Sequence, residues 1–230
     1  MRPRLSLLTF TGLATLAGLS LTVTTTAISP TPSEVELLNT ATLIFRRAVE
    51  SPAAAIPAAV MMRASAIAVF PDVVKDGNRH YGKGVMSARG ARPDAWTPPA
   101  FIALEGAIPF DLNVQPIDFI IIAQSRRGLD HLIHDGIATP IQSPMSAGAI
   151  GHSTPARINA DLLAYMQFDL YFAGITIRDW SVRAMTESNA ALYGRPYSTD
   201  DVVRGAGFFH MPSPARTWRD AIAAYFREMS

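Results

Sequence analysis

The spacing of apolar residues changes along the chain, and this change limits the possible folds more than any other feature of the sequence. In residues 33–50 apolar side chains recur every three or four positions, the period of a helix with one buried face. Between residues 65 and 123 the apolar runs are short and the period falls to two, as in strands. The helical period returns at residues 213–229. Short strands grouped between helices predict an α+β fold with an antiparallel, barrel-like sheet flanked by N-terminal and C-terminal helices.

Local signals set the expected boundaries of these elements. Ser33 and Glu36 have the spacing of a capping box, which predicts a helix start, and Pro57 predicts the start of a second short helix that ends near Arg63. The residues Asp76-Gly77-Asn78 favour a turn, which predicts a hairpin between two strands. Expected strands are residues 65–70, 82–89, 101–108, 118–123, 145–151, 162–168 and 171–177. Later helices are expected at residues 125–136, 183–193 and 213–229.

The N-terminal segment has the order of a secretory signal. A short basic start is followed by an apolar run from Leu5 to Leu21 and by small residues up to Ala27. We expect residues 1–27 to be a signal peptide cleaved near Ala27, residues 28–32 a linker, and residues 33–230 a single domain that is exported, to the periplasm in a bacterium. The alternative is an uncleaved membrane anchor, because an apolar run of about 17 residues can just span a bilayer.

Export changes the charge balance. The whole chain carries a net charge of +1, but removal of Arg2 and Arg4 leaves 18 basic against 19 acidic side chains and a net charge of −1. No global positive field therefore attracts the exported form to nucleic acid or anionic lipid. Any such binding has to come from a local patch, and no nucleic-acid partner is expected.

Several kinds of chemistry are absent from the sequence. The chain has no cysteine, which excludes disulfides, thiolate catalysis, cysteine zinc sites and acylation at a cysteine. The glycines around Lys83 lack the spacing of a phosphate loop and interrupt an expected strand, where glycine marks a bulge or close packing. No enzyme activity, metal or cofactor is expected.

Two weaker alternatives remain open for the histidines. His131 and His134 lie three residues apart beside Asp130 and Asp135, yet no third ligand follows in a zinc-binding motif. A hydrolase would need a Ser-His-Asp set that only the fold can assemble, because no serine lies in a Gly-x-Ser-x-Gly motif. A concave pocket that gathers two of His80, His131 and His152 with an acid would favour it.

The order of several segments is more specific than any single motif. They read IPAAVMMRASAIAVFP, YGKGVMSAR, AWTPPAFIALEGA, IDFIIIAQS, AGAIG, LLAYMQFDLYFAGITI and NAALYGRP. In sequence and order they resemble the SYLF-domain family, from about Val35 to Tyr197. The resemblance implies binding to lipid or to a membrane surface, as eukaryotic relatives bind phosphoinositide membranes and actin filaments and bacterial relatives are exported. It brings no catalytic residues.

The chain departs from the family pattern at several glycines. They are replaced by Glu105, Pro109, Asn113 and Leu170. Pro109 removes a backbone donor, so we expect the strand around it to be interrupted or to lie at an edge. If the family's glycine-rich hairpin faces lipid, these replacements put that activity in doubt here.

The leading hypothesis is an exported, non-enzymatic protein that binds phospholipid through a local basic and aromatic patch. Its predicted residues are Lys75, Lys83, Arg89, Trp96, Arg126 and Arg127. Trp96 is also expected to pack where the strand after Pro98 and Pro99 begins, as framework. The alternative function is an envelope protein-interaction module, which would present an exposed apolar surface instead.

Overall fold

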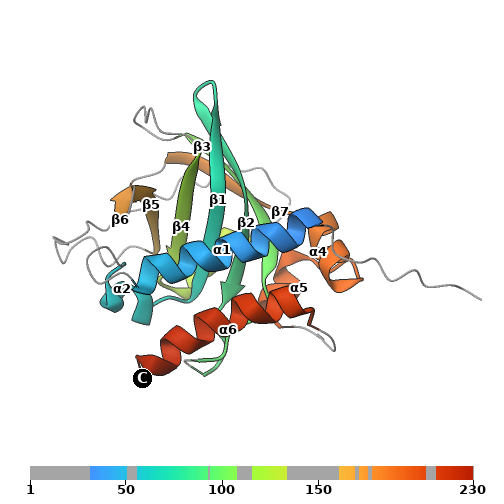
Figure 1. Cartoon of the computed structure of the whole chain (residues 1–230). Helices are drawn as coiled ribbons and strands as arrows, with labels where there is room; N and C mark the ends of the chain where they lie inside the picture. The colour runs from blue at the N-terminus through green and yellow to red at the C-terminus, as the bar shows by residue number, and fades with distance from the viewer. Residues whose placement is uncertain are drawn as a thin grey trace, which may run out of the picture.

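The computed structural model describes residues 32–50, 56–92, 94–107, 116–133, 161–168, 171–175, 178–205 and 211–229 (Figure 1). Strands and helices alternate irregularly along the chain, with one long helix at each end of the described part. The elements are α1 (Pro32–Glu50), α2 (Ala58–Met62), β1 (Ala66–Asp76), β2 (Arg79–Ala88), β3 (Ala100–Ala107), β4 (Ile117–Ala123), α3 (Arg126–Ile133), β5 (Leu162–Phe168), β6 (Tyr171–Ile175), β7 (Arg178–Ala184), α4 (Thr186–Tyr193), α5 (Thr199–Val203) and α6 (Ser213–Glu228).

The strands form one antiparallel sheet of seven strands in the order β6-β5-β4-β1-β2-β3-β7. β6 and β7 are its two edges and are not paired with each other, so the described strands do not close a barrel. Only two residues separate Ile175 of β6 from Arg178 of β7. A link of that length spans at most about 11 Å, so the sheet curls until its edges almost meet at one end. The predicted α+β fold with an antiparallel sheet is confirmed.

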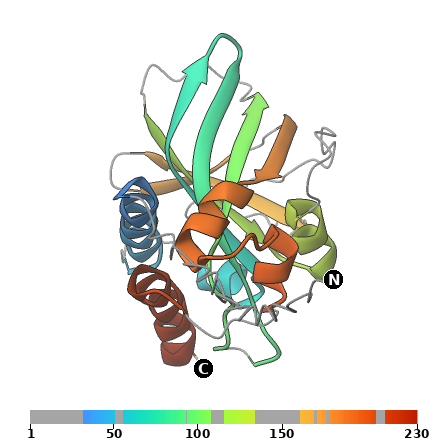
Figure 2. The ribbon, with the colours of Figure 1, turned by 90° about the vertical axis from the view of Figure 1, so that its right-hand side faces the viewer.

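α1 and α6 lie side by side on one face of this sheet (Figures 1 and 2). Their buried residues recur at helical spacing, as expected for α1 and α6 from the sequence: Leu38, Ala41, Phe45 and Ala48 in α1, and Trp218, Ile222 and Phe226 in α6. The indole of Trp218 donates a hydrogen bond of 2.8 Å to the Ser87 hydroxyl of β2. The ring of Phe45 meets that indole edge-on at 6.1 Å, so α1 packs on α6 at the residue that binds α6 to the sheet.

Alternate residues on the strands bury against a second core on the other face of the sheet. Phe70, Met86 and Phe119 belong to this second core, together with Leu132 of α3 and Val202 of α5. The sheet is therefore covered on both faces over most of β1 and β4, whose apolar runs the sequence shows as nearly continuous.

The hairpin of β1 and β2 is longer than the sequence predicts. The strands were expected to end near residue 70 and to resume at 82, but they pair up to Asp76 and Arg79 and project from the molecule (Figure 1). Gly77 makes the turn with a φ of 58°. A register shift lies between Val69 and Val74, where Asp72 has a φ of 50°. This bulge bends the projecting part of β1 away from the rest of the strand.

One predicted helix was wrong at its start. The helix expected at residues 183–193 begins at Thr186, because residues 178–184 form the edge strand β7. Trp180 and Val182 bury against the second core, whereas Arg183 is exposed on the other face of the sheet, as in a strand. The helix-favouring run Arg183-Ala184-Met185 obscured this pattern. The helix ends as expected at Gly194, with a φ of 69°. The short helix α5 was not predicted.

Other predicted elements agree with the structure or lie outside it. β3, β4, β5 and β6 fall within two residues of their expected positions. The strand expected at residues 145–151, the end of the helix expected at 125–136, and Pro109 all lie outside the described residues. Glu105 in β3 forms an ion pair of 2.7 Å with Arg79.

The glycines beside Lys83 allow close packing within the sheet. A Cβ at Gly84 would lie 2.4 Å from the Phe70 ring and 2.4 Å from the backbone oxygen of Val69. A Cβ at Gly82 would lie 2.5 Å from a methyl of Val73. These side chains lie against the glycine backbone on one face, while Lys83 between the glycines projects from the other face.

We expect Gly84→Ala to lower the free energy of unfolding by about 1–3 kcal/mol, because the added methyl forces the Phe70 ring and the β1 backbone to move. Urea unfolding followed by tryptophan fluorescence measures the change. Glu50→Gln at the exposed end of α1 is the control and should leave the midpoint unchanged. A Gly84→Ala protein with the wild-type midpoint would contradict this account of the packing.

Candidate functional site

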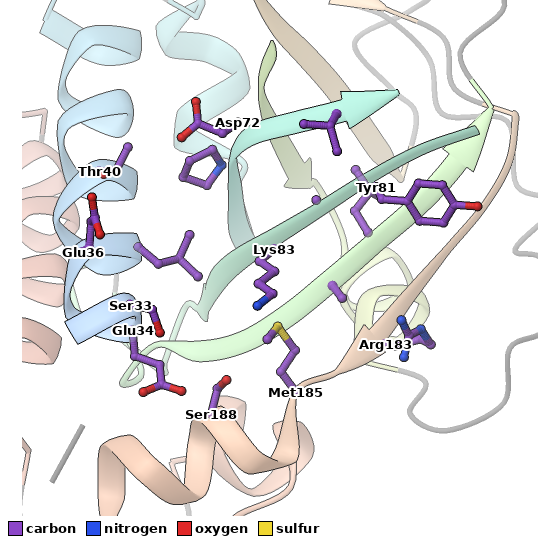
Figure 3. A pocket seen from close by; sticks show the side chains of 16 residues that line it. Ser33, Glu34, Glu36, Thr40, Asp72, Tyr81, Lys83, Arg183, Met185 and Ser188 are labelled. Atoms are coloured by element: carbon purple, nitrogen blue, oxygen red, sulfur yellow. The ribbon is translucent and has the colours of Figure 1, made fainter. Parts of the chain in front are cut away.

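A hollow lies between the first turns of α1 and the sheet, at the base of the projecting hairpin (Figure 3). Its volume is about 570 Å³. The lining comes from five segments of the fold: Ser33, Glu34, Glu36, Leu37 and Thr40 of α1; Pro71, Asp72 and Val74 of β1; Tyr81, Gly82 and Lys83 of β2; Ala103 and Leu104 of β3; and Arg183, Met185 and Ser188 from β7 to α4. The hollow contains no histidine in its lining.

Two cations stand on the sheet side of the hollow. Lys83 of β2 pairs in register with Ala103 of β3, and Ala103 pairs with Arg183 of β7. Residues directly opposite each other in antiparallel strands project from the same face, so the two cations flank the small Ala103 side chain. Both cations are exposed, and neither forms an ion pair with another residue of the described part of the chain.

Carboxylates stand on the opposite side. Glu34 and Glu36 come from the first turns of α1, and Asp72 comes from the β1 bulge (Figure 3). The bulge is held by the backbone N–H of Asp72, which donates a hydrogen bond of 3.0 Å to Asp118 of β4. Burial raises the pKa of the Asp118 carboxyl, and the hydrogen bond from Asp72 partly opposes this effect. The hollow therefore has a positive side and a negative side.

The end of the hollow nearest α4 is fixed by hydrogen bonds to β3. The backbone N–H of Met185 donates to the Phe101 oxygen at 3.0 Å, and the N–H of Phe101 donates to the side-chain oxygen of Asn189 at 2.8 Å. Asn189 is fully buried. Met185 and Ser188 are consequently held at the rim by rigid elements rather than by a loop.

Two of the predicted lipid-binding residues, Lys75 and Lys83, lie on the projecting hairpin, and both are exposed. Val74 and Tyr81 are paired across the same hairpin and are 50% and 37% exposed, among the most exposed large apolar side chains of the described residues. The hairpin thus combines cations with an apolar pair.

Arg89 and Trp96 lie at the other end of the sheet, beneath α6. Trp96 is 6% exposed, and its ring lies 5.0 Å from that of Phe226. The Arg89 guanidinium stacks over both rings and donates to the backbone oxygens of Met61 and Met62 at 3.2 and 3.0 Å. Burial lowers the pKa of Arg89. The framework role expected for Trp96 is therefore seen, and Arg89 shares it.

Arg126 and Arg127 begin α3 on the other face of the sheet and are exposed. The Arg127 side chain forms an ion pair with Asp161, whose carboxylate also accepts a hydrogen bond from Ser125. The Ser125 hydrogen bond, and after it Arg127, hold the pKa of Asp161 below its ordinary value. Arg127 is thus engaged in fastening the start of α3.

The six predicted residues do not share one surface. Arg89 is hydrogen-bonded beside Ser65, next to the start of β1, while Lys75 lies near its end, roughly 30 Å away along the strand. The sequence also left out residues that line the hollow. Arg183 was expected in a helix, and no sequence signal joined it or Glu34 to Lys83.

The fold and the hollow together define an α+β protein with a curled antiparallel sheet, two helices across one face, and a charged hollow beneath the first helix. A comparison with family models matches residues 106–225 to Ysc84, described as Las17-binding protein actin regulator. The match covers 120 of the 230 residues, so the chain belongs to this family, the SYLF-domain family named from its motifs. A search of curated proteins found no match.

The matched residues include β4 to β7 and most of α6, whereas α1, β1 and β2 precede them. The hollow is therefore built partly from matched residues, such as Arg183, and partly from the preceding segment. Within the described residues, no helix has both the length and the apolar character needed to cross a membrane. The same residues hold no group of three metal-ligating side chains.

We expect Arg89→Ala to lower the free energy of unfolding by about 2 kcal/mol, because it removes two hydrogen bonds and the stacking on Trp96 and Phe226. Guanidinium unfolding measures the change. The matched control is Arg92→Ala, an exposed arginine 3.9 Å from Asp94, which should have little effect. Equal midpoints for the two variants would show that Arg89 is not part of the framework.

Proposed function

We propose that the chain is an exported, non-enzymatic protein that binds phospholipid at a membrane surface, with the β1–β2 hairpin as the contacting element. Membership of the SYLF-domain family supports a lipid-binding role, and the signal-like residues 1–27 support export. The observation that carries the proposal is the exposed Val74–Tyr81 pair on a projecting hairpin, with Lys83 on the same face of the strands and Lys75 on the other face.

The composition of this hairpin suits an interface between water and lipid. Tyrosine is amphipathic and is enriched at membrane surfaces, and valine adds apolar area beside it. Each lysine near an anionic surface contributes about 1 kcal/mol of attraction. Because the hairpin projects from the sheet, it can reach a flat surface before the rest of the molecule does (Figure 1).

The other predicted residues are less suited to this contact. Trp96 is buried against Phe226, and the Arg89 guanidinium stacks over both rings. Arg126 and Arg127 lie on α3, on the opposite face of the sheet from α1 and α6. The net charge of −1 of the exported form also favours a local contact over a broad basic face.

A second candidate is a protein-interaction module of the envelope. The family description names a protein partner, and the exposed Val74–Tyr81 pair would serve an apolar protein contact equally well. The two candidates differ in their dependence on lipid and on salt. A hydrolase has less support, because the hollow gathers none of the histidines it would need.

The test is co-sedimentation of residues 28–230 with neutral or anionic liposomes at low and high salt. This fragment retains the whole described core, from Leu38 to Phe226. We expect binding to anionic vesicles that falls steeply with salt. The double variant Lys75→Glu, Lys83→Glu should bind at least about 30-fold more weakly, from about 1 kcal/mol for each lysine.

The matched control for charge reversal is Arg195→Glu, an exposed arginine after α4 that is not on the hairpin. It should bind vesicles like the wild type. Binding that ignores salt would reject the basic-hairpin mechanism. Failure to bind any vesicle would favour the protein-interaction candidate, and pull-down from an envelope extract would then seek the partner.

A further inference from the structure

The two cations of the hollow lie near carboxylates of the same lining but form no ion pair with them. Some other arginines of the described chain are paired with acids, as Arg79 is with Glu105 and Arg204 with Asp200. In the hollow, Lys83 and Arg183 form no ion pair with any described residue, although three carboxylates line the same hollow. A space is therefore left between opposite charges.

The sign of these charges restricts what can occupy that space. Glu34, Glu36 and Asp72 outnumber Lys83 and Arg183, so the lining carries a net charge of −1. A ligand that is only anionic is repelled by the α1 side, and one that is only cationic is repelled by the sheet side. A molecule with both charges satisfies both sides, because each end meets groups of the opposite sign.

The geometry of the cationic side suits an oxyanion group. Lys83 and Arg183 are separated by two strand spacings, roughly 10 Å between backbones, with only the methyl of Ala103 between them. Long side chains of this kind can converge on a phosphate or carboxylate above the small residue, and arginine can bind such a group through two N–H donors.

Part of the remaining lining is apolar, and the size suits a small molecule. Leu37 and Met185 supply apolar surface, and about 570 Å³ lies within the range of small-molecule sites. The walls come from α1, from paired strands and from the hydrogen-bonded start of α4, so the site exists before a ligand arrives.

We propose that this hollow binds a dipolar small molecule, with its phosphate or carboxylate on Lys83 and Arg183 and its primary ammonium group toward Glu36. The site goes beyond the proposed membrane contact, because a soluble ligand can fill it without any vesicle. The ammonium end would donate hydrogen bonds to the Glu36 carboxylate of α1, and the apolar part would lie against Leu37 and Met185.

The test is calorimetric titration of residues 28–230 at low salt with glycerophosphoethanolamine, which carries both charges. Glycerol phosphate supplies the anion alone and ethanolamine the cation alone. We expect saturable binding of glycerophosphoethanolamine, at least about 10-fold tighter than that of either half, since each half leaves one side of the hollow unsatisfied. Equal binding of glycerol phosphate would overturn the dipolar proposal.

Two variants test whether the ligand binds in the hollow. Arg183→Ala and Glu36→Gln should each weaken binding about 10-fold or more, because each removes a charged partner. The matched controls, Arg195→Ala and Glu50→Gln, are exposed residues outside the lining and should bind like the wild type. Amide NMR shifts at Ala103 and Lys83 provide a second readout that does not depend on the stability of a variant. Wild-type affinity in both hollow variants would overturn the proposal.

Two further experiments distinguish a lipid headgroup from a free amino acid as the natural ligand. Leucine is a free amino acid with both charges and an apolar side chain, and vesicles containing phosphatidylethanolamine present the same charges on a lipid. Competition by these vesicles assigns the site to a lipid headgroup, whereas leucine binding without such competition assigns it to a free amino acid. Absence of binding by both soluble compounds overturns the proposal, and co-sedimentation with anionic vesicles then still tests the membrane contact separately.

Discussion

The hydrogen bond from the Trp218 indole to Ser87 joins α6 to the middle of the sheet, and the rest of the helix layer depends on it. Both residues are fully buried, so loss of the bond would leave a desolvated polar group without a partner. Phe45 packs edge-on against the same indole and thereby holds α1 beside α6. Because α1 forms one side of the charged hollow, a contact deep in the core sets the separation between the acids of the helix and the cations of the sheet.

The elements that the sequence predicted well are those whose pattern is local. α1 and α6 have apolar residues at helical spacing over many turns. The turn at Gly77 could be predicted because Asp, Gly and Asn are typical turn residues. β7 was missed because its seven residues continue directly toward α4 with residues that favour helices. These residues form a strand because they pair with β3, about 80 positions earlier in the chain, and a local sequence pattern cannot predict such a distant pairing.

The hollow could not be predicted for the same reason. Lys83 and Arg183 are brought together only by two successive strand pairings through Ala103, and Glu36 is brought opposite them only by helix packing. Conversely, the role of the stretch Trp96-Thr97-Pro98-Pro99 could be predicted from its own residues. Trp96 is an internal support for α6 through Phe226, and the two prolines precede β3 without needing partners in the ladder.

The pairing of β3 with β7 has a consequence for how this chain is assembled. β1, β2 and β3 are neighbours in sequence and can pair as soon as they are synthesised, whereas β7 arrives much later. Until then β3 is an open edge whose backbone groups can pair with another chain. The interval before β7 pairs with β3 is therefore the stage of folding at which a holding chaperone would be most useful.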